Sequence, residues 1–152
     1  MAKFIYRLQN VLDVKYKMEN QAKTAFALAG NKLREEEEKY ERLVKKRNSY
    51  ENDYRQALET NLDIPYINLL RNGIEKVKGD MKNQLVNVKV ASKNLDLARN
   101  KLEEAIKDRK IHEKLKENAF EQFKMELNEQ EKKEIDELVS FTYGTNSKTG
   151  GE

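Results

Sequence analysis

A single proline, Pro65, divides this chain of 152 residues into two long tracts that contain no clusters of turn-forming residues. Proline lacks a backbone N–H and its ring clashes with the preceding helical turn, so helices end before it or restart on it. Asp63 can cap a new helical N-terminus, and Pro65 is compatible with the first turn of that helix. The stretch LDIPYIN, residues 62–68, therefore predicts a hinge between two long helices.

Apolar side chains recur along the first tract in alternating steps of three and four residues, the spacing of a coiled-coil seam. The predicted seam runs through Phe4, Leu8, Val11, Met18, Ala22, Ala25, Ala29, Leu33, Tyr40, Leu43, Arg47, Tyr50 and Tyr54. Two consecutive steps of four between Ala25 and Leu33 predict a stutter, which locally unwinds a supercoil. Because Lys15 and Glu36 interrupt the seam, we expect a polar coiled coil of moderate stability.

The second tract repeats this spacing over a longer stretch. Its predicted seam runs through Leu70, Ile74, Val77, Met81, Gln84, Val88, Ala91, Leu95, Ala98, Leu102, Ala105, Arg109, His112, Lys116, Ala119 and Phe123. If the chain folds back at the hinge, residues whose numbers sum to about 124 face each other in an antiparallel pair. Phe4 then faces Phe120, and Tyr50 faces Ile74.

The predicted fold class is all-α, an antiparallel two-helix coiled-coil hairpin with a C-terminal helical overhang. We expect a single hairpin over residues 1–143, with helices at about 4–60 and about 66–142 and a hinge at about 61–65. Gly144 favours a helix end, so residues 144–152 are expected to form a disordered tail. Disorder of the whole chain is the competing interpretation, because 38% of the residues are charged. The regular apolar spacing favours helices instead.

Composition excludes several classes of protein. The absence of cysteine excludes disulfides, thiolate catalysis and cysteine-based zinc sites. The N-terminal stretch carries charges throughout, so we expect no signal peptide, and no uncharged run approaches the roughly 18 residues of a membrane span. Acidic and basic residues are mixed over the first two thirds, which argues against a nucleic-acid-binding stripe. We expect a protein that is cytosolic or at most peripheral to a membrane.

Residues suited to catalysis or metal binding are sparse. His112 is the only histidine, and its place on the seam favours a tolerated polar seam residue over a catalyst. Glu131, Asp136 and Glu137 lack histidine partners and the spacing of a calcium-binding loop. The chain also has no glycine-rich phosphate loop. We therefore expect a protein that is not an enzyme and has no cofactor or metal.

The end of the second helix has the features of a binding surface. Roughly 20 residues, from Glu121 to Tyr143, extend past the predicted reach of the first helix. This overhang carries an apolar stripe made of Phe123, Leu127, Ile135, Leu138, Val139 and Phe141. Acidic residues outnumber basic ones from 111 to 152. An amphipathic helix without a partner helix predicts a surface that binds another protein.

Both ends of the sequence resemble the family of the flagellar export protein FliJ. The stretch FIYRLQNVLDVKYKMENQA, residues 4–22, resembles the N-terminal signature of that family. The matching positions are Phe4, Arg7, Leu8, Gln9, Val11, Leu12 and Glu19. Residues 107–139 resemble its C-terminal segment, with Leu115, Glu131, Asp136 and Glu137 at matching positions. The isolated glycines Gly73 and Gly79 depart from the family pattern.

The resemblance implies a protein of bacterial flagellum biogenesis and motility. It implies a cytoplasmic rod at the inner face of the cell membrane, similar to the central stalk of rotary ATPases. The implied partners are the hexameric export ATPase FliI, the export-gate protein FlhA and export chaperones, and the isolated protein is expected to be a monomer. We expect the ATPase-binding tip to comprise Phe123, Leu127, Glu131, Ile135, Asp136, Glu137 and Leu138.

Two questions stay open at the level of sequence. Leu70, Ile74, Val77 and Met81 are most simply core residues, but they could bind the export gate if the helices splay near Gly73 and Gly79. The shape of the protein also suits a generic coiled-coil scaffold. It equally suits the stalk subunit of a rotary ATPase or of a virulence secretion system.

Overall fold

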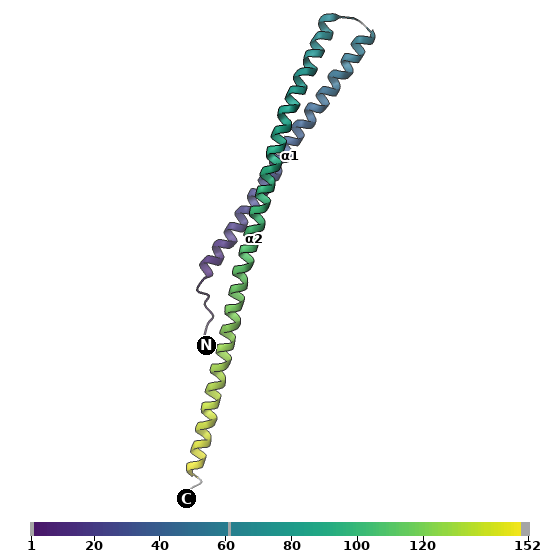
Figure 1. Ribbon diagram of the computed structural model, residues 1–152. Helices are drawn as coiled ribbons and strands as arrows, with labels where there is room; N and C mark the ends of the chain where they lie inside the picture. The colour runs from purple at the N-terminus through teal and green to yellow at the C-terminus, as the bar shows by residue number, and fades with distance from the viewer. Residues whose placement is uncertain (1, 61, 150–152) are drawn as a thin grey trace. The chain divides into compact units, whose positions relative to one another are not determined.

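The computed structural model describes residues 2–60 and 62–149, with side chains described as far as Gly144. It contains two helices, α1 at Gln9–Thr60 and α2 at Ile64–Thr149. Figure 1 shows the two helices running in opposite directions from their connection. The fold is therefore all-α, with two long antiparallel helices packed as a hairpin, which confirms the predicted fold class.

The connection between the helices follows the chemistry expected of Asp63 and Pro65. The backbone N–H of Tyr66 donates to the Asp63 side chain over 3.5 Å, and that of Ile67 donates to the Asp63 carbonyl oxygen over 2.9 Å. Asp63 thus caps α2 and accepts from N–H groups that have no partner within a helical first turn. Pro65 occupies that first turn, where its missing N–H removes no helical hydrogen bond.

Both helices differ in extent from the ranges suggested by the sequence. Residues 2–6 are not helical, and α1 begins at Gln9, whose N–H donates to the Tyr6 carbonyl oxygen over 3.2 Å. At the other end, α2 continues through Gly144 to Thr149. Gly144 does not have the positive φ of a left-handed C-cap, and no proline follows it, so the helix has no stop signal there. The final residues of the expected tail, 150–152, lie outside the described residues.

Over the first half of α1, every second seam position lies one residue after the predicted one, whereas Lys15, Ala22 and Ala29 are half-buried as predicted. Leu12, Glu19 and Phe26 turn inward, whereas Val11, Met18 and Ala25 are exposed. The inward positions alternate in steps of three and four from Leu12 to Ala57, so the predicted stutter is absent. The prediction missed this register because it passed over Glu19, which is only 6% exposed.

Contacts divide the protein into two compact units, and each unit contains a segment of both helices. The hinge unit comprises Glu19–Ala105, and the terminal unit comprises Met1–Met18 together with Ile106–Glu152. The core of the hinge unit is formed by Ala57, Leu70, Ile74, Val77, Met81 and Ala91.

In the hinge unit the helices pair in the predicted register. A Cβ placed on Gly73 would lie 3.5 Å from the Tyr50 ring. Tyr50 therefore faces Gly73, one residue before its predicted partner Ile74. Similarly, a Cβ on Gly30 would lie 3.9 Å from the Leu95 side chain. These contacts are expected, because a short connection between two regular helices determines which residues face each other.

A polar layer interrupts the apolar core of the hinge unit. The Gln84 side-chain amide donates to the Glu36 carbonyl oxygen over 2.9 Å and to the Glu36 carboxylate over 2.5 Å. Lys32 and Lys39 approach the same carboxylate at 3.0 and 3.6 Å. The pKa of Glu36 is lowered, chiefly by the hydrogen bond from Gln84 and next by the one from Lys32. The charge that interrupts the seam is therefore fully partnered.

In the terminal unit, an aromatic cluster closes the end of the pair of helices. The Phe4 ring lies 5.1 Å from the Phe120 ring and 5.4 Å from the Phe123 ring, between centroids. The first of these contacts confirms the predicted pairing of Phe4 with Phe120. Leu12, at 2% exposure, is the most deeply buried of the core side chains in this unit. The cluster holds the non-helical N-terminal segment against α2.

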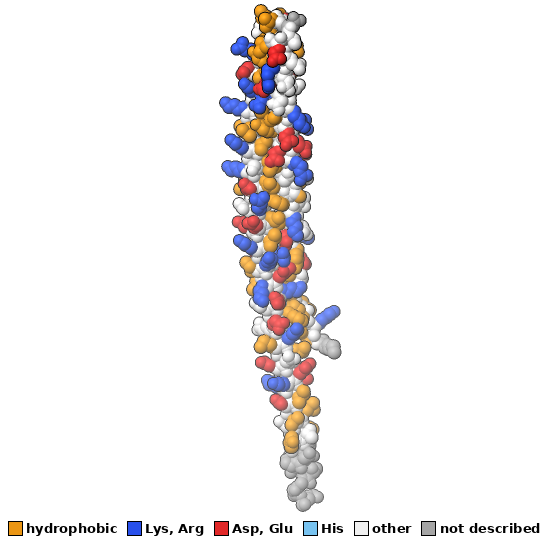
Figure 2. Space-filling view, turned by 90° about the vertical axis from the view of Figure 1, so that its right-hand side faces the viewer, with side chains coloured by type: hydrophobic (Ala, Val, Ile, Leu, Met, Phe, Trp, Pro, Cys, Tyr) orange, Lys and Arg blue, Asp and Glu red, His pale blue; other side chains and the backbone are white. Residues whose placement is uncertain are grey.

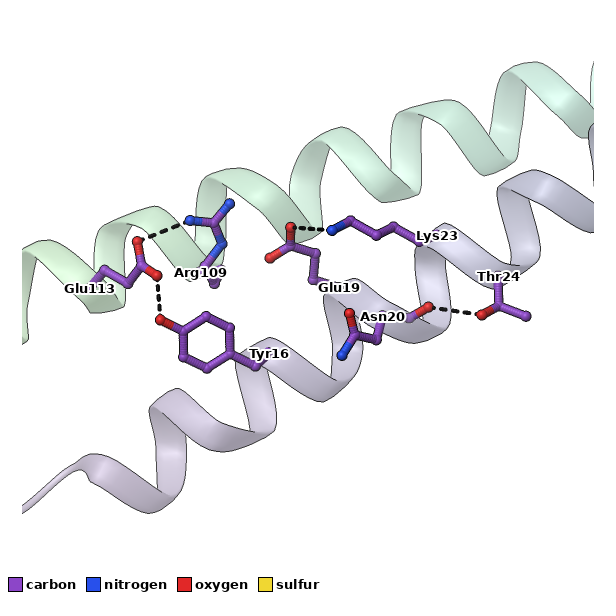
Figure 3. Close-up of polar contacts among 7 residues, drawn as sticks. All are labelled: Tyr16, Glu19, Asn20, Lys23, Thr24, Arg109 and Glu113. Atoms are coloured by element: carbon purple, nitrogen blue, oxygen red, sulfur yellow. Dashed lines mark hydrogen bonds and ion pairs between the residues drawn. The ribbon is translucent and has the colours of Figure 1, made fainter.

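Polar contacts join the helices of the terminal unit as well. The Lys15 ammonium lies 2.8 Å from Asp108, and its hydrogen bond is the main reason that the pKa of Asp108 is lowered. Figure 3 shows the Tyr16 hydroxyl donating to Glu113, which also accepts from Arg109 over 2.9 Å. Lys15, the other predicted interruption of the seam, is therefore paired across the helices.

Candidate partner-binding surface

The geometry around His112 does not form a catalytic centre. Its Nε2 atom lies 3.6 Å from Asp108, whose other oxygen contacts Lys15, and its Nδ1 atom is buried without a hydrogen-bond partner. No nucleophile is placed beside the ring by these contacts, so His112 is a seam residue. Among residues 2–60 and 62–144, no cluster of His, Asp and Glu side chains could hold a metal ion. Neither helix, within the residues that the structure describes, is long and apolar enough to cross a membrane.

The C-terminal part of α2 presents its side chains to solvent. Every residue from Asn128 to Gly144 is exposed. Ile135, Leu138 and Val139, the C-terminal stripe, are 59%, 66% and 46% exposed. Figure 2 shows hydrophobic side chains gathered just before the grey C-terminal residues. Because three- and four-residue spacings bring side chains together on a helix surface, these three form one apolar patch.

Acidic side chains surround the C-terminal stripe. Glu131, Asp136 and Glu137 are exposed on the same stretch of α2. Glu134 and Glu137 also line a shallow groove together with Leu138 and Phe141. From 128 to 144 the chain has five acidic residues and two basic ones, Lys132 and Lys133. The segment therefore combines an apolar patch with an excess of negative charge, which suits a basic protein surface with an apolar pocket.

The structure corrects where the exposed overhang begins. Phe123 was expected to have no intramolecular partner, but its ring packs on Phe4, and Leu127 is half-buried. The reason is geometric: Phe120 and Phe123 are three residues apart on one face of α2, so a single Phe4 ring reaches both. The fully exposed segment starts at Asn128 rather than at Glu121.

The four residues considered for the export gate lie in the core of the hinge unit. Leu70, Ile74, Val77 and Met81 are at most 9% exposed. Their burial agrees with the simpler interpretation of the sequence, in which they hold the helices together. The exposed apolar residues near the connection are Leu58, Leu62, Ile64, Tyr66 and Leu69. Sequence reasoning missed this group because its members lie off the seam, although their position around Pro65 could have indicated them.

The fold and surface define a class of protein: a two-helix antiparallel coiled coil with an exposed apolar and acidic segment that is suited to binding another protein. The family model of the flagellar FliJ protein matches residues 4–148, and the chain therefore belongs to the FliJ family. This family comprises non-catalytic components of the flagellar type III export apparatus.

Comparison with solved structures supports the same fold. The chain is similar to the YscO homolog CT670 from Chlamydia trachomatis, with a TM-score of 0.81 and 22% sequence identity. The match covers 96% of this chain and 99% of the other. No match was found among curated proteins.

Proposed function

We propose that this protein is a stalk-like rod that binds the hexameric export ATPase FliI through the C-terminal part of α2. The observation that supports the proposal most is the exposed C-terminal stripe, Ile135, Leu138 and Val139, set among carboxylates. Each large apolar side chain buried in a partner contributes about 1.5–3 kcal/mol. The carboxylates of Glu131, Asp136 and Glu137 steer the segment toward a basic collar, which makes capture sensitive to salt.

The proposal also gives the rod a second end that contacts the export gate. FlhA is the proposed partner at the hinge end, and export chaperones are further partners. Two surfaces could bind the export gate. One is formed by the exposed residues around Pro65, and the other is the stripe from Leu70 to Met81 if the helices separate there. The proposed location is the cytoplasm, with peripheral association at the inner face of the membrane at the flagellar base.

Membership of the FliJ family favours this assignment over a generic coiled-coil scaffold. The stalk of a virulence secretion system would have the same fold. The flagellar family model, which spans nearly the whole chain, favours the flagellar ATPase as the partner.

The test is stimulation of the purified ATPase by the full-length protein. Replacement of both Ile135 and Leu138 by Ser should abolish stimulation, because it removes the apolar anchors. The melting temperature should stay unchanged, since both side chains are exposed in the free protein. Leu28→Ser is a matched control, because Leu28 is 63% exposed but lies in the hinge unit. Full stimulation by the double variant would show that this segment does not bind the ATPase.

A further inference from the structure

A second apolar stripe lies on the outer face of α2 within the hinge unit. Val86, Val90 and Leu97, the outer stripe, are 57%, 53% and 52% exposed. Spacings of four and seven residues place the three side chains on one face of a helix. The buried seam residues Gln84 and Ala91 lie on the opposite side of α2. The outer stripe therefore contributes nothing to the core of the hairpin.

The residue types on this face are unfavourable for an exposed helix. Valine loses side-chain freedom in a helix, so polar straight-chain residues or alanine suit a solvated position better. Gly79 lies seven residues before Val86 on the same face, and a Cβ there would meet no atom within 4 Å. Glycine in a helix interior costs about 1 kcal/mol relative to alanine, and internal packing does not require it here. A partner that approaches the backbone closely would account for both features.

Basic side chains flank the outer stripe on one side. Lys82, Lys89 and Lys93 are exposed, and none forms an ion pair with the described residues. From Met81 to Leu95 the chain contains no Asp or Glu. Asn83 and Asn94 lie along the other side of the stripe. The face thus offers a narrow apolar strip with a row of unpaired positive charges beside it.

We propose that the outer face of α2, from Gly79 to Leu97, is a docking site for an acidic amphipathic helix of a partner protein. The apolar strip would pack against the seam of that helix, and the three lysines would pair with its carboxylates. Gly79 would admit the partner backbone at one end of the site. This site lies in the hinge unit, and it is separate from the C-terminal stripe used in the proposed function.

The test measures binding of two fluorescent synthetic peptides to the full-length protein by anisotropy. Both peptides are helices of about three heptads with a Leu and Ala seam, and they carry either Glu or Lys at the flanking positions. The Glu peptide should bind roughly tenfold more tightly than the Lys peptide. Replacement of Val86 and Val90 by Ser should weaken binding of the Glu peptide about tenfold. Replacement of Lys82, Lys89 and Lys93 by Glu should reverse the preference between peptides.

Two control variants and a folding measurement accompany the peptide-binding experiment. Val14→Ser alters an equally exposed valine in the terminal unit and should not change binding. The Ile135 and Leu138 double variant should also bind the Glu peptide normally, which separates this proposal from the proposed function. Circular dichroism establishes that each variant is folded.

Several results would overturn the proposal. Equal binding of both peptides, or an affinity unaffected by the Val86 and Val90 replacements, would do so. A dimer in sedimentation velocity that these replacements disperse would assign the face to a second copy of the chain. Binding to anionic phosphatidylglycerol vesicles without peptide binding would assign it to a lipid surface.

Discussion

Gln84 on α2 donates its side-chain amide to the buried carboxylate of Glu36 on α1, over 2.5 Å. Glu36 is 6% exposed and Gln84 is 9% exposed, so neither side chain has full access to water. The Glu36 carboxylate also contacts Lys32 and Lys39 on its own helix, so Gln84 is its hydrogen-bond donor from α2. Loss of that donor is destabilising, because a buried polar group then lacks one of its partners. Shifting one helix along the other would separate the pair, so this layer fixes the register of the hinge unit.

Changing one member of this pair should be worse than changing both. Gln84→Leu should lower the melting temperature, because it leaves the Glu36 carboxylate without its donor from α2. Replacing both residues by Leu should restore most of the loss, since two apolar side chains then pack in the same layer. The measurement is thermal unfolding followed by circular dichroism. A double variant less stable than the single variant would contradict this account of the layer.

The same pair makes stability depend on pH. The pKa of Glu36 is lowered in the folded protein, chiefly by the hydrogen bond from Gln84. A carboxyl whose pKa is lowered by folding stabilises the fold above its unfolded pKa, and it loses that contribution as pH falls through the folded pKa. The stability difference between the wild type and Glu36→Gln should therefore shrink as pH falls from about 7 to about 3. Urea unfolding at several pH values measures it, and a constant difference would contradict the mechanism.

Gly79→Ala should stabilise the protein by about 1 kcal/mol, because alanine has the higher helix propensity and the new methyl group meets open space. Gly73→Ala is the matched comparison. The new methyl group would contact the Tyr50 ring at 3.5 Å, an ordinary packing distance. Comparing the two variants therefore tests whether this packing contact stabilises the protein beyond the gain in helix propensity. Urea unfolding gives both values. Destabilisation by Gly79→Ala would show that the surroundings of Gly79 are more crowded than the structure indicates.

Phe4→Ala should loosen the terminal unit and leave the hinge unit unchanged. The substitution removes ring contacts with Phe120 and Phe123, and an aromatic pair contributes about 0.5–1.5 kcal/mol beyond burial. Hydrogen exchange should become faster at the start of α1 and around Phe120. Ile5→Ala is the control, since Ile5 is 80% exposed. Faster exchange throughout the hinge unit would mean that the cluster stabilises more than its own unit.

The regular parts of this fold are well predicted from sequence, since heptad spacing and one proline determine two helices and their direction. The register of α1 near Glu19 was wrong because a buried glutamate resembles a solvent-facing residue in any apolar pattern. The end of α2 was misplaced because Gly144 is compatible with a helix as well as with a cap. The exposure of Ile135 and Leu138 agrees with the expected overhang, whereas the partnership of Phe123 with Phe4 depends on a non-helical segment that periodicity does not describe.

The central claim is that the C-terminal part of α2, rather than the hinge end, binds the export ATPase. Photo-crosslinking from a single site tests it most directly, with the crosslinking residue at Leu138 in one variant and at Leu69 in another. The two positions are matched, because they are 66% and 68% exposed. The account predicts a crosslink to the ATPase from Leu138, none from Leu69, and loss of the Leu138 crosslink at high salt. A crosslink from Leu69 without one from Leu138 would contradict it.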